Sequence, residues 1–100
     1  MNIKQLQNNQ IIIKDGTKTT FFSYNAQIAT IQNGVLSFTN QWNYSKTTLK
    51  YLYKFLEEER EELNILYKEL LSYNKYFINK NKKQYLQNLI NDKMIIIEEA

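Results

Sequence analysis

Tyrosine, lysine and asparagine side chains alternate along residues 73–85, a stretch whose chemistry suits partner binding. Tyrosine rings can stack on nucleobases while lysines neutralise phosphates, so the pattern is compatible with nucleic-acid binding. It is also typical of an amphipathic helix end whose lysines complement the helix dipole, followed by a solvated loop. We favour this second interpretation because the chain has a single arginine and no glycine-rich phosphate loop. The candidate partner-binding residues of this stretch are Tyr73, Lys75, Tyr76, Lys80, Lys82, Lys83 and Tyr85.

A second candidate lies at residues 42–48, which hold the only tryptophan, a tyrosine and three hydroxyl residues. As a recognition surface, this junction would present hydrogen bonds and charge from Tyr44, Lys46 and Lys50. As a strand-to-helix corner, it would bury Trp42, use Tyr44 as a hydrophobic staple and cap the helix with its hydroxyls. We favour the corner, and we rank the helical face beyond residue 58 and the 73–85 stretch first as binding surfaces.

The residue types argue against catalysis. The chain has no histidine, the side chain best suited to proton transfer near neutrality. It also has no cysteine, which excludes thiolate chemistry and disulfides. No nucleophile, base and orienting group can be assembled, so we expect a protein that is not an enzyme and has no cofactor and no metal. The acidic run at residues 57–62 is best interpreted as a solvated helix face, because consecutive helical side chains point around the axis.

Length and charge predict one small domain over residues 1–100. The net charge is +3, but residues 1–50 hold five lysines against Asp15 alone, while residues 51–100 hold eight basic and nine acidic residues. This bipolar distribution is not that of a general polyanion binder. No apolar run is long enough for a membrane span or a signal peptide, so we expect a cytoplasmic protein with no membrane partner.

Hairpin signals dominate residues 1–42. Asp15-Gly16 and Asn33-Gly34 each separate runs rich in β-branched and aromatic residues and tolerate the positive φ of a type I′ turn. A two-residue loop at Asn33-Gly34 would pair Ala29 with Phe38 and leave room for a helix across that face. Residues 11–13 are all isoleucine, which fits a strand covered on both sides or one with a weakly specified register. Residues 23–25 are expected to bend or bulge one long strand.

Helical periodicity dominates residues 45–92. Apolar residues recur every seven positions from Leu49 to Phe77, and a companion series comprises Leu52, Glu59, Leu66 and Tyr73. This stripe predicts either one helix of about 30 residues or two helices broken near residues 59–64. A projecting helix would need a partner, and a homodimer through this stripe would supply one. A third helix is predicted at residues 82–91 and a strand at 94–98. The fold class is α+β: a small antiparallel sheet of hairpins, with a C-terminal strand, packed against two or three α-helices.

Residues 20–57 resemble a family of small uncharacterised phage proteins. The resemblance rests on the strand segment SYNAQIA at residues 23–29 and on WNYSKTTLK at residues 42–50, which opens a helix ending in Phe55-Leu56. The family pattern has threonine where this chain has Ala26, and many members carry histidine where it has Tyr51. The resemblance implies a phage or prophage origin and no assigned activity.

These observations together predict a non-enzymatic, phage-encoded binding protein in the cytoplasm of a bacterial host. We expect it to inhibit a host or bacterial-defence protein, and an anti-CRISPR-like inhibitor is the sharpest version of this hypothesis. The alternative is a small DNA- or RNA-binding regulator that uses the lysines and aromatic residues of the 73–85 stretch. Its partner would be a nucleic acid or a nucleoprotein.

Overall fold

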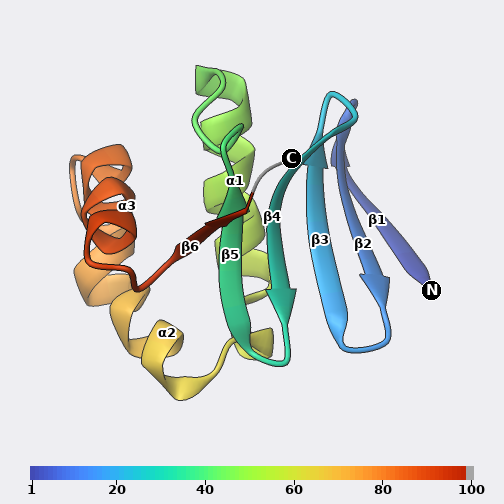
Figure 1. Cartoon of the computed structure of the whole chain (residues 1–100). Coiled ribbons are helices and arrows are strands. Elements are labelled where there is room, and N and C mark those ends of the chain that lie inside the picture. Colours follow the sequence, from blue (N-terminus) through green and yellow to red (C-terminus); the bar gives the residue numbers. More distant parts are fainter. Residues whose placement is uncertain (99–100) are drawn as a thin grey trace.

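A six-stranded sheet with helices on one face forms the molecule (Figure 1). The computed structural model describes residues 1–98, except for the side chain of Tyr73. The strands lie side by side in sequence order. Strands β1 to β5 pair antiparallel and β6 pairs parallel to β5. Their bounds are β1 Asn2–Gln7, β2 Gln10–Asp15, β3 Lys18–Ser23, β4 Ala26–Gln32, β5 Val35–Thr39 and β6 Ile96–Glu98. The predicted α+β class is confirmed, and the C-terminal strand is present.

Both predicted glycine hairpins form. Gly16 and Gly34 have φ values of +63° and +81°, which a residue with a Cβ adopts only with strain. The second hairpin has the predicted register, with Ala29 opposite Phe38. Gly34 is also held close to the helical layer, because its carbonyl accepts a hydrogen bond from the backbone N–H of Asn64 at 3.0 Å. A Cβ at Gly34 would lie 3.0 Å from that same residue.

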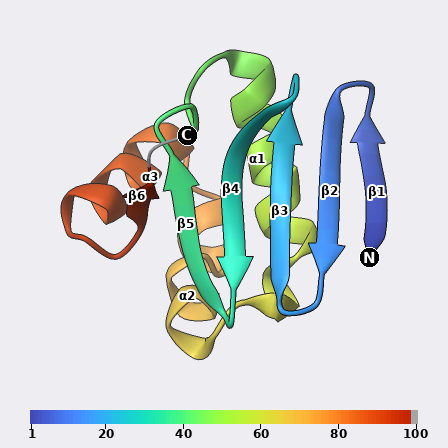
Figure 2. The same ribbon diagram turned by 45° about the vertical axis from the view of Figure 1, so that its right-hand side comes forward.

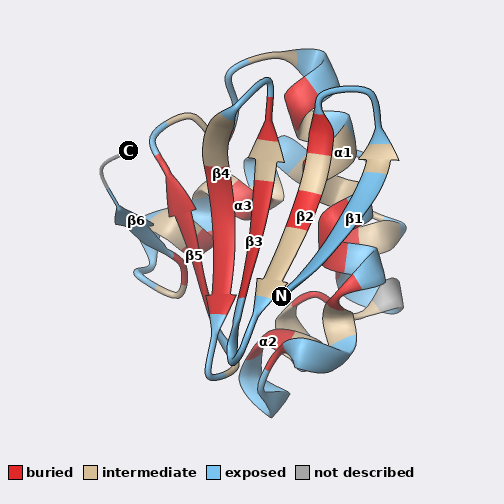
Figure 3. Ribbon diagram, turned by 90° about the vertical axis from the view of Figure 1, so that its right-hand side faces the viewer, coloured by how far each residue is buried: buried red, intermediate tan, exposed pale blue. Residues whose placement is uncertain are grey.

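Three features of the sheet differ from the sequence-based expectation. Residues 24 and 25 do not bend a single strand; both have positive φ and form a tight hairpin turn between β3 and β4. Strand β1 is not predicted by any alternation in residues 2–7 and owes its place to pairing with β2. Only Ile12 of the isoleucine run is buried against the helices, while Ile11 and Ile13 lie half-buried on the helix-free face, so this strand is not covered on both sides (Figure 3).

The helical half is broken rather than continuous. Helix α1 ends at Glu58, a 3-10 turn follows, and α2 starts at Ile65, so the long-helix alternative is wrong. The predicted third helix is confirmed with the expected bounds. The helical segments are α1 Lys46–Glu58, η1 Arg60–Glu62, α2 Ile65–Leu70, the π-helical turn η2 Tyr73–Phe77 and α3 Lys82–Asn91. The crossover through these helices allows β6 to run parallel to β5 (Figure 2).

The core lies between α1 and the sheet. The Phe21 and Phe55 rings stack with centroids 5.5 Å apart, and the rings of Trp42 and Phe38 stack at 5.6 Å. The stripe of apolar residues that recur every seven positions packs partly into this core, where three of its leucines are almost completely buried. They are Leu52, Leu56 and Leu63. These three leucines pack in the chain's own core, and the homodimer through the stripe stays a prediction.

Candidate partner-binding site

Three connections meet at the end of the sheet where α1 begins, and we call this surface the loop end. It comprises residues 8–9 between β1 and β2, residues 24–25 between β3 and β4, and residues 40–45 between β5 and α1 (Figure 2). The first two connections are tied together, because the backbone N–H of Tyr24 donates to the carbonyl of Asn9 at 2.8 Å. Asparagine, tyrosine, glutamine and serine make up most of the loop end.

A cavity of about 230 Å³ opens between the second and third of these connections. Its lining comes entirely from two short segments, residues 23–28 and residues 41–48. The lining residues are Ser23, Tyr24, Ala26, Ile28, Gln41, Tyr44 and Thr48. The SYNAQIA and WNYSKTTLK segments singled out from the sequence therefore form the two walls of one pocket.

Hydroxyl groups link the two walls. The Ser23 and Thr48 hydroxyl oxygens lie 3.0 Å apart, and both residues are buried. The Ser45 hydroxyl donates to Thr48 Oγ1 at 3.2 Å, and Ser45 Oγ accepts the Thr48 backbone N–H at 3.1 Å. Of the two hydroxyl residues expected to cap this helix, Ser45 and Thr47, Ser45 is the N-cap of α1. Thr48 joins this cap to the β3–β4 hairpin.

A buried amide lies on the same face of the sheet as this hydroxyl cluster. Gln10 sits opposite Ser23 in the β2–β3 register and is 1% exposed. Neither its amide nitrogen nor its amide oxygen has a hydrogen-bond partner among the described residues. Buried polar groups are nearly always paired, so this end of the core retains hydrogen-bonding capacity that the fold itself does not use.

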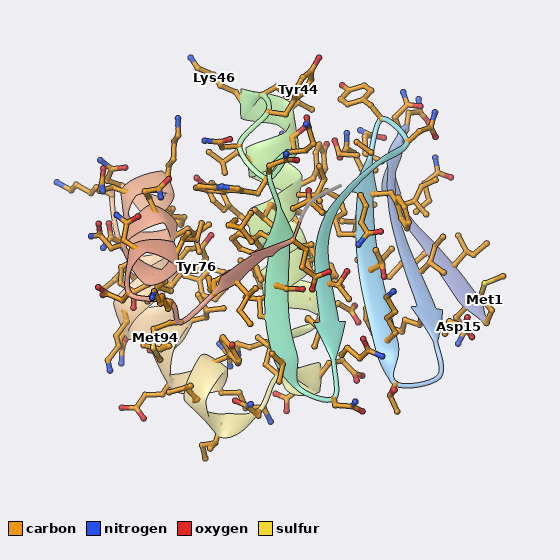
Figure 4. All side chains as sticks on the ribbon, in the orientation of Figure 1. Met1, Asp15, Tyr44, Lys46, Tyr76 and Met94 are labelled. Atoms are coloured by element: carbon orange, nitrogen blue, oxygen red, sulfur yellow. The ribbon has the colours of Figure 1, made fainter. Side chains whose placement is uncertain are left out.

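The two tyrosines of the pocket project from the protein. Tyr44 is 72% exposed and Tyr24 is 51% exposed. The expected staple role of Tyr44 is wrong, because its ring turns outward from the start of α1, beside Lys46 (Figure 4). Trp42, by contrast, is buried, which confirms that this residue forms the corner. Tyr24 has φ +50°, a left-handed conformation that a bulky side chain rarely adopts, and such backbone strain often marks a functional position.

Charge is distributed unevenly between the two ends of the sheet. The residues that form and flank the loop end, 7–10, 23–28 and 39–50, contain no acid, and their only charges are Lys46 and Lys50. Both lysines are exposed, and the Lys50 ammonium lies 5.4 Å from the ring centroid of its neighbour Tyr51. The lining of the pocket is therefore uncharged, and the charged residues nearest to it along the chain are lysines.

Acids gather at the opposite end, where α1 finishes. The Glu59 carboxylate is 2% exposed and forms an ion pair with Lys14 at 2.6 Å, while Lys4 pairs with Glu58. Lys4 holds the pKa of Glu58 below its ordinary value, and the hydrogen bond to Glu59 raises the pKa of Lys14. The described residues contain no group of three acids placed to hold a metal ion. These contacts fasten α1 to β1 and β2.

Two tyrosines of the 73–85 stretch, Tyr76 and Tyr85, make contacts within the fold. Tyr76 is fully buried, and its ring lies within 6 Å, centroid to centroid, of the rings of Tyr53, Phe77 and Tyr85. Its assignment as a partner-binding residue is wrong, because the helical segments fold around this ring rather than presenting it. Tyr85 is half-buried, and its hydroxyl donates to the carbonyl of Leu70 at 2.6 Å. The side chain of Tyr73 lies outside the described part of the structure.

The lysines of the same stretch are dispersed. Lys75 pairs with Glu69 at 3.4 Å. Lys82 donates to the carbonyl of Asn79 at 3.2 Å, and its ammonium lies 5.9 Å from the Tyr53 ring centroid. Lys80 and Lys83 are exposed. Among the described side chains, these cations are therefore not joined to exposed tyrosines in the alternating surface that base stacking would need.

The site and fold define a small α+β protein with a neutral pocket at one end of a sheet that is covered by helices on one face. The chain belongs to the family of unknown function DUF8033, whose model matches residues 1–72. The match spans β1 to β5, α1, α2 and every residue that lines the pocket, whereas residues 73–100 lie outside it. No curated protein and no solved structure matched the chain. No helix within residues 1–98 is long and apolar enough to cross a membrane.

Proposed function

We propose that this protein is a non-enzymatic, phage-encoded binding protein that inhibits a host or bacterial-defence protein by docking through its loop end. An anti-CRISPR-like inhibitor is the sharpest form of the proposal. The observation that carries it is the composition of the loop end: exposed tyrosines among asparagine, glutamine and serine, on short connections of a rigid sheet. The phage origin is supported by the resemblance of residues 23–29 and 42–50 to small phage proteins.

This composition matches the physics of protein recognition by loops. Tyrosine offers a large contact area at low conformational entropy cost, while serine and asparagine adapt their hydrogen bonds to the partner. The connections are short and tied to each other and to α1, so little order must be gained on binding. Because no acid or base lines the pocket, the site offers ring faces and hydrogen bonds rather than proton transfer.

The test is affinity capture from bacterial host lysate with three baits. These are the unchanged protein, a loop-end variant Tyr24→Ser/Tyr44→Ser, and a control variant Ile65→Ser/Ile78→Ser. Ile65 and Ile78 are 84% and 59% exposed, so the control removes large exposed side chains outside the loop end. We expect one protein to be retained by the unchanged and control baits and lost from the loop-end variant.

Inhibition is tested by titrating the captured protein's own activity. We expect activity to fall linearly and to reach its minimum near one equivalent of the unchanged chain, as stoichiometric inhibition requires. Equal capture by all three baits, or full activity at saturation, would contradict the proposal. Binding of duplex or single-stranded nucleic acid in a low-salt mobility shift, with affinity that falls steeply as salt rises, would instead favour the DNA- or RNA-binding regulator.

A further inference from the structure

The loop-end pocket has the size of one side chain. Its volume of about 230 Å³ lies below the roughly 300 to 1,000 Å³ typical of sites for drug-sized ligands and cofactors. Binding energy at protein interfaces is concentrated in a few anchor residues that fill such pockets, and tyrosine, tryptophan and arginine are enriched among them. The question is therefore which of these side chains the lining accepts.

The walls favour an aromatic ring. Tyr24 and Tyr44, which are both more than half exposed, line the pocket together with the apolar side chains of half-buried Ala26 and buried Ile28. Aromatic pairs gain energy beyond their buried area when the rings are offset-stacked or edge-to-face. Because both tyrosines are more than half exposed in the unbound protein, a third ring between them would bury surface that the fold leaves in water.

The inner end of the pocket favours a ring that carries a polar group. Ser45, Thr48 and Ser23 bring three hydroxyl protons, and the two contacts among these hydroxyls use two of them. One hydroxyl donor is therefore left over in the cluster, and the Ser23 and Thr48 hydroxyls line the pocket. Gln41 adds a side-chain amide to the lining. A phenol oxygen can accept the spare hydroxyl proton, and a phenol O–H or an indole N–H can donate to a hydroxyl oxygen or to the Gln41 amide oxygen. A phenylalanine ring can do neither.

Charge disfavours the remaining anchor, arginine. No carboxylate lines the pocket, and the nearest charged side chain in the sequence, Lys46, adjoins the segment that forms one wall. A guanidinium would lose its water without gaining an acid partner, which costs free energy. A buried carboxylate of the partner would lack a cation within the lining for the same reason.

We propose that this pocket receives a tyrosine or tryptophan side chain of the partner protein. The proposal rests on the function proposed above and specifies the anchor residue that the partner must supply. It assigns Tyr24 and Tyr44 to ring contact, and the hydroxyl cluster with Gln41 to the polar atom of the anchor.

The proposal can be tested without the partner by titrating capped amino acids into ¹⁵N-labelled protein and following amide shifts. The probes are N-acetyl-tyrosinamide and N-acetyl-tryptophanamide, with the phenylalanine and arginine analogues and adenosine for comparison. We expect shifts at residues 23–28 and 41–48, with the tyrosine and tryptophan probes binding about five-fold more tightly than the phenylalanine probe. Equal affinity for all probes, tightest binding of adenosine, or shifts confined to other surfaces would overturn the proposal.

Two variants check the location. Ala26→Leu enlarges an apolar side chain of the lining, and Tyr44→Ala removes an aromatic ring from it. We expect each change to weaken binding of the tyrosine probe at least five-fold. Val35→Leu is the matched control, because Val35 is exposed on β5 and lies outside the pocket. Because Tyr44 is 72% exposed, we expect Tyr44→Ala to fold normally. This variant therefore tests the location even if Ala26→Leu does not fold. If the unchanged protein binds the probes but captures no partner, the proposed function is refuted and the pocket assignment stands. If it captures a partner but binds no probe, the assignment of the pocket to a tyrosine or tryptophan anchor is refuted and the proposed function stands.

Discussion

The hydroxyls of Ser23 and Thr48 lie 3.0 Å apart in the core, although 25 positions separate the two residues. This contact joins the last residue of β3 to the first turn of α1. It places the Tyr24 turn and the Tyr44 segment on opposite sides of one pocket. The spacing of the loop end therefore depends on a buried polar contact between a strand and a helix.

Removing either hydroxyl should weaken this link. We expect Ser23→Ala and Thr48→Val each to lower the free energy of unfolding by about 0.5 to 1.5 kcal/mol, because each leaves its buried partner with one hydrogen bond fewer. Urea denaturation of the two single variants and the double variant gives a double-mutant cycle, in which we expect a coupling above about 0.5 kcal/mol. Strictly additive losses would show that the contact adds no stability.

Tyr24 should be replaceable without loss of stability. Its φ of +50° suits asparagine better than tyrosine, so we expect Tyr24→Asn to match or exceed the unchanged protein in unfolding free energy, by up to about 1 kcal/mol. Partner capture should nevertheless fall. Equilibrium urea denaturation and affinity capture measure the two effects, and a loss of more than 1 kcal/mol would mean that the ring serves the fold rather than recognition.

The Lys14–Glu59 ion pair should behave as a buried pair. Glu59 is 2% exposed, so Lys14→Met leaves its buried carboxylate without the nearer of its two lysines, while Lys4 remains 3.9 Å away. We therefore expect Lys14→Met to destabilise the fold by about 1 to 3 kcal/mol. The double variant Lys14→Met/Glu59→Met should recover most of that loss, since no charge then remains buried. Thermal and urea unfolding test this, and a double variant less stable than Lys14→Met would contradict it.

The Lys4–Glu58 ion pair should give an acid-dependent stability. Lys4 lowers the pKa of Glu58 from its ordinary 4.5, so the pair stabilises the fold above pH 4.5, and this stabilisation is lost as the pH falls through the lowered value. We expect Lys4→Gln to be less stable than the unchanged chain at pH 7 and the difference to shrink as the pH falls below 4.5. Unfolding midpoints measured from pH 3 to 7 provide the comparison; a difference that grows in acid would be the opposite result.

Buried Tyr76 and half-buried Tyr85 should respond differently to loss of the hydroxyl. Burial raises the pKa of Tyr76 far above its ordinary value, and its hydroxyl has no hydrogen-bond partner among the described side chains and backbone. We expect Tyr76→Phe to be neutral or stabilising by up to about 1 kcal/mol. Tyr85→Phe removes the bond to the Leu70 carbonyl and should cost about 1 kcal/mol. Equal losses in the two variants, measured in urea, would show that Tyr76 has an equivalent bond.

Local signals in the sequence predicted much of the fold. Turn residues with positive φ and strand-forming flanks located the hairpins at Gly16 and Gly34, and periodicity located the helix at residues 82–91. These features depend on neighbouring residues, whose conformational preferences are written in the chain. The hairpin at Tyr24-Asn25 escaped prediction because tyrosine seldom occupies a left-handed turn position. Strand β1 escaped because its place depends on pairing with β2.

The site was decided only by the tertiary structure. The sequence identified SYNAQIA and WNYSKTTLK as separate segments, and residues 73–85 as the richest in aromatic and basic side chains. Periodicity cannot tell which aromatic ring a helical layer will enclose, and the fold buries Tyr76 while it exposes Tyr44. Because burial and the meeting of distant segments arise from packing between elements, only the assembled sheet and helices could place Ser23 beside Thr48 and turn two motifs into one pocket.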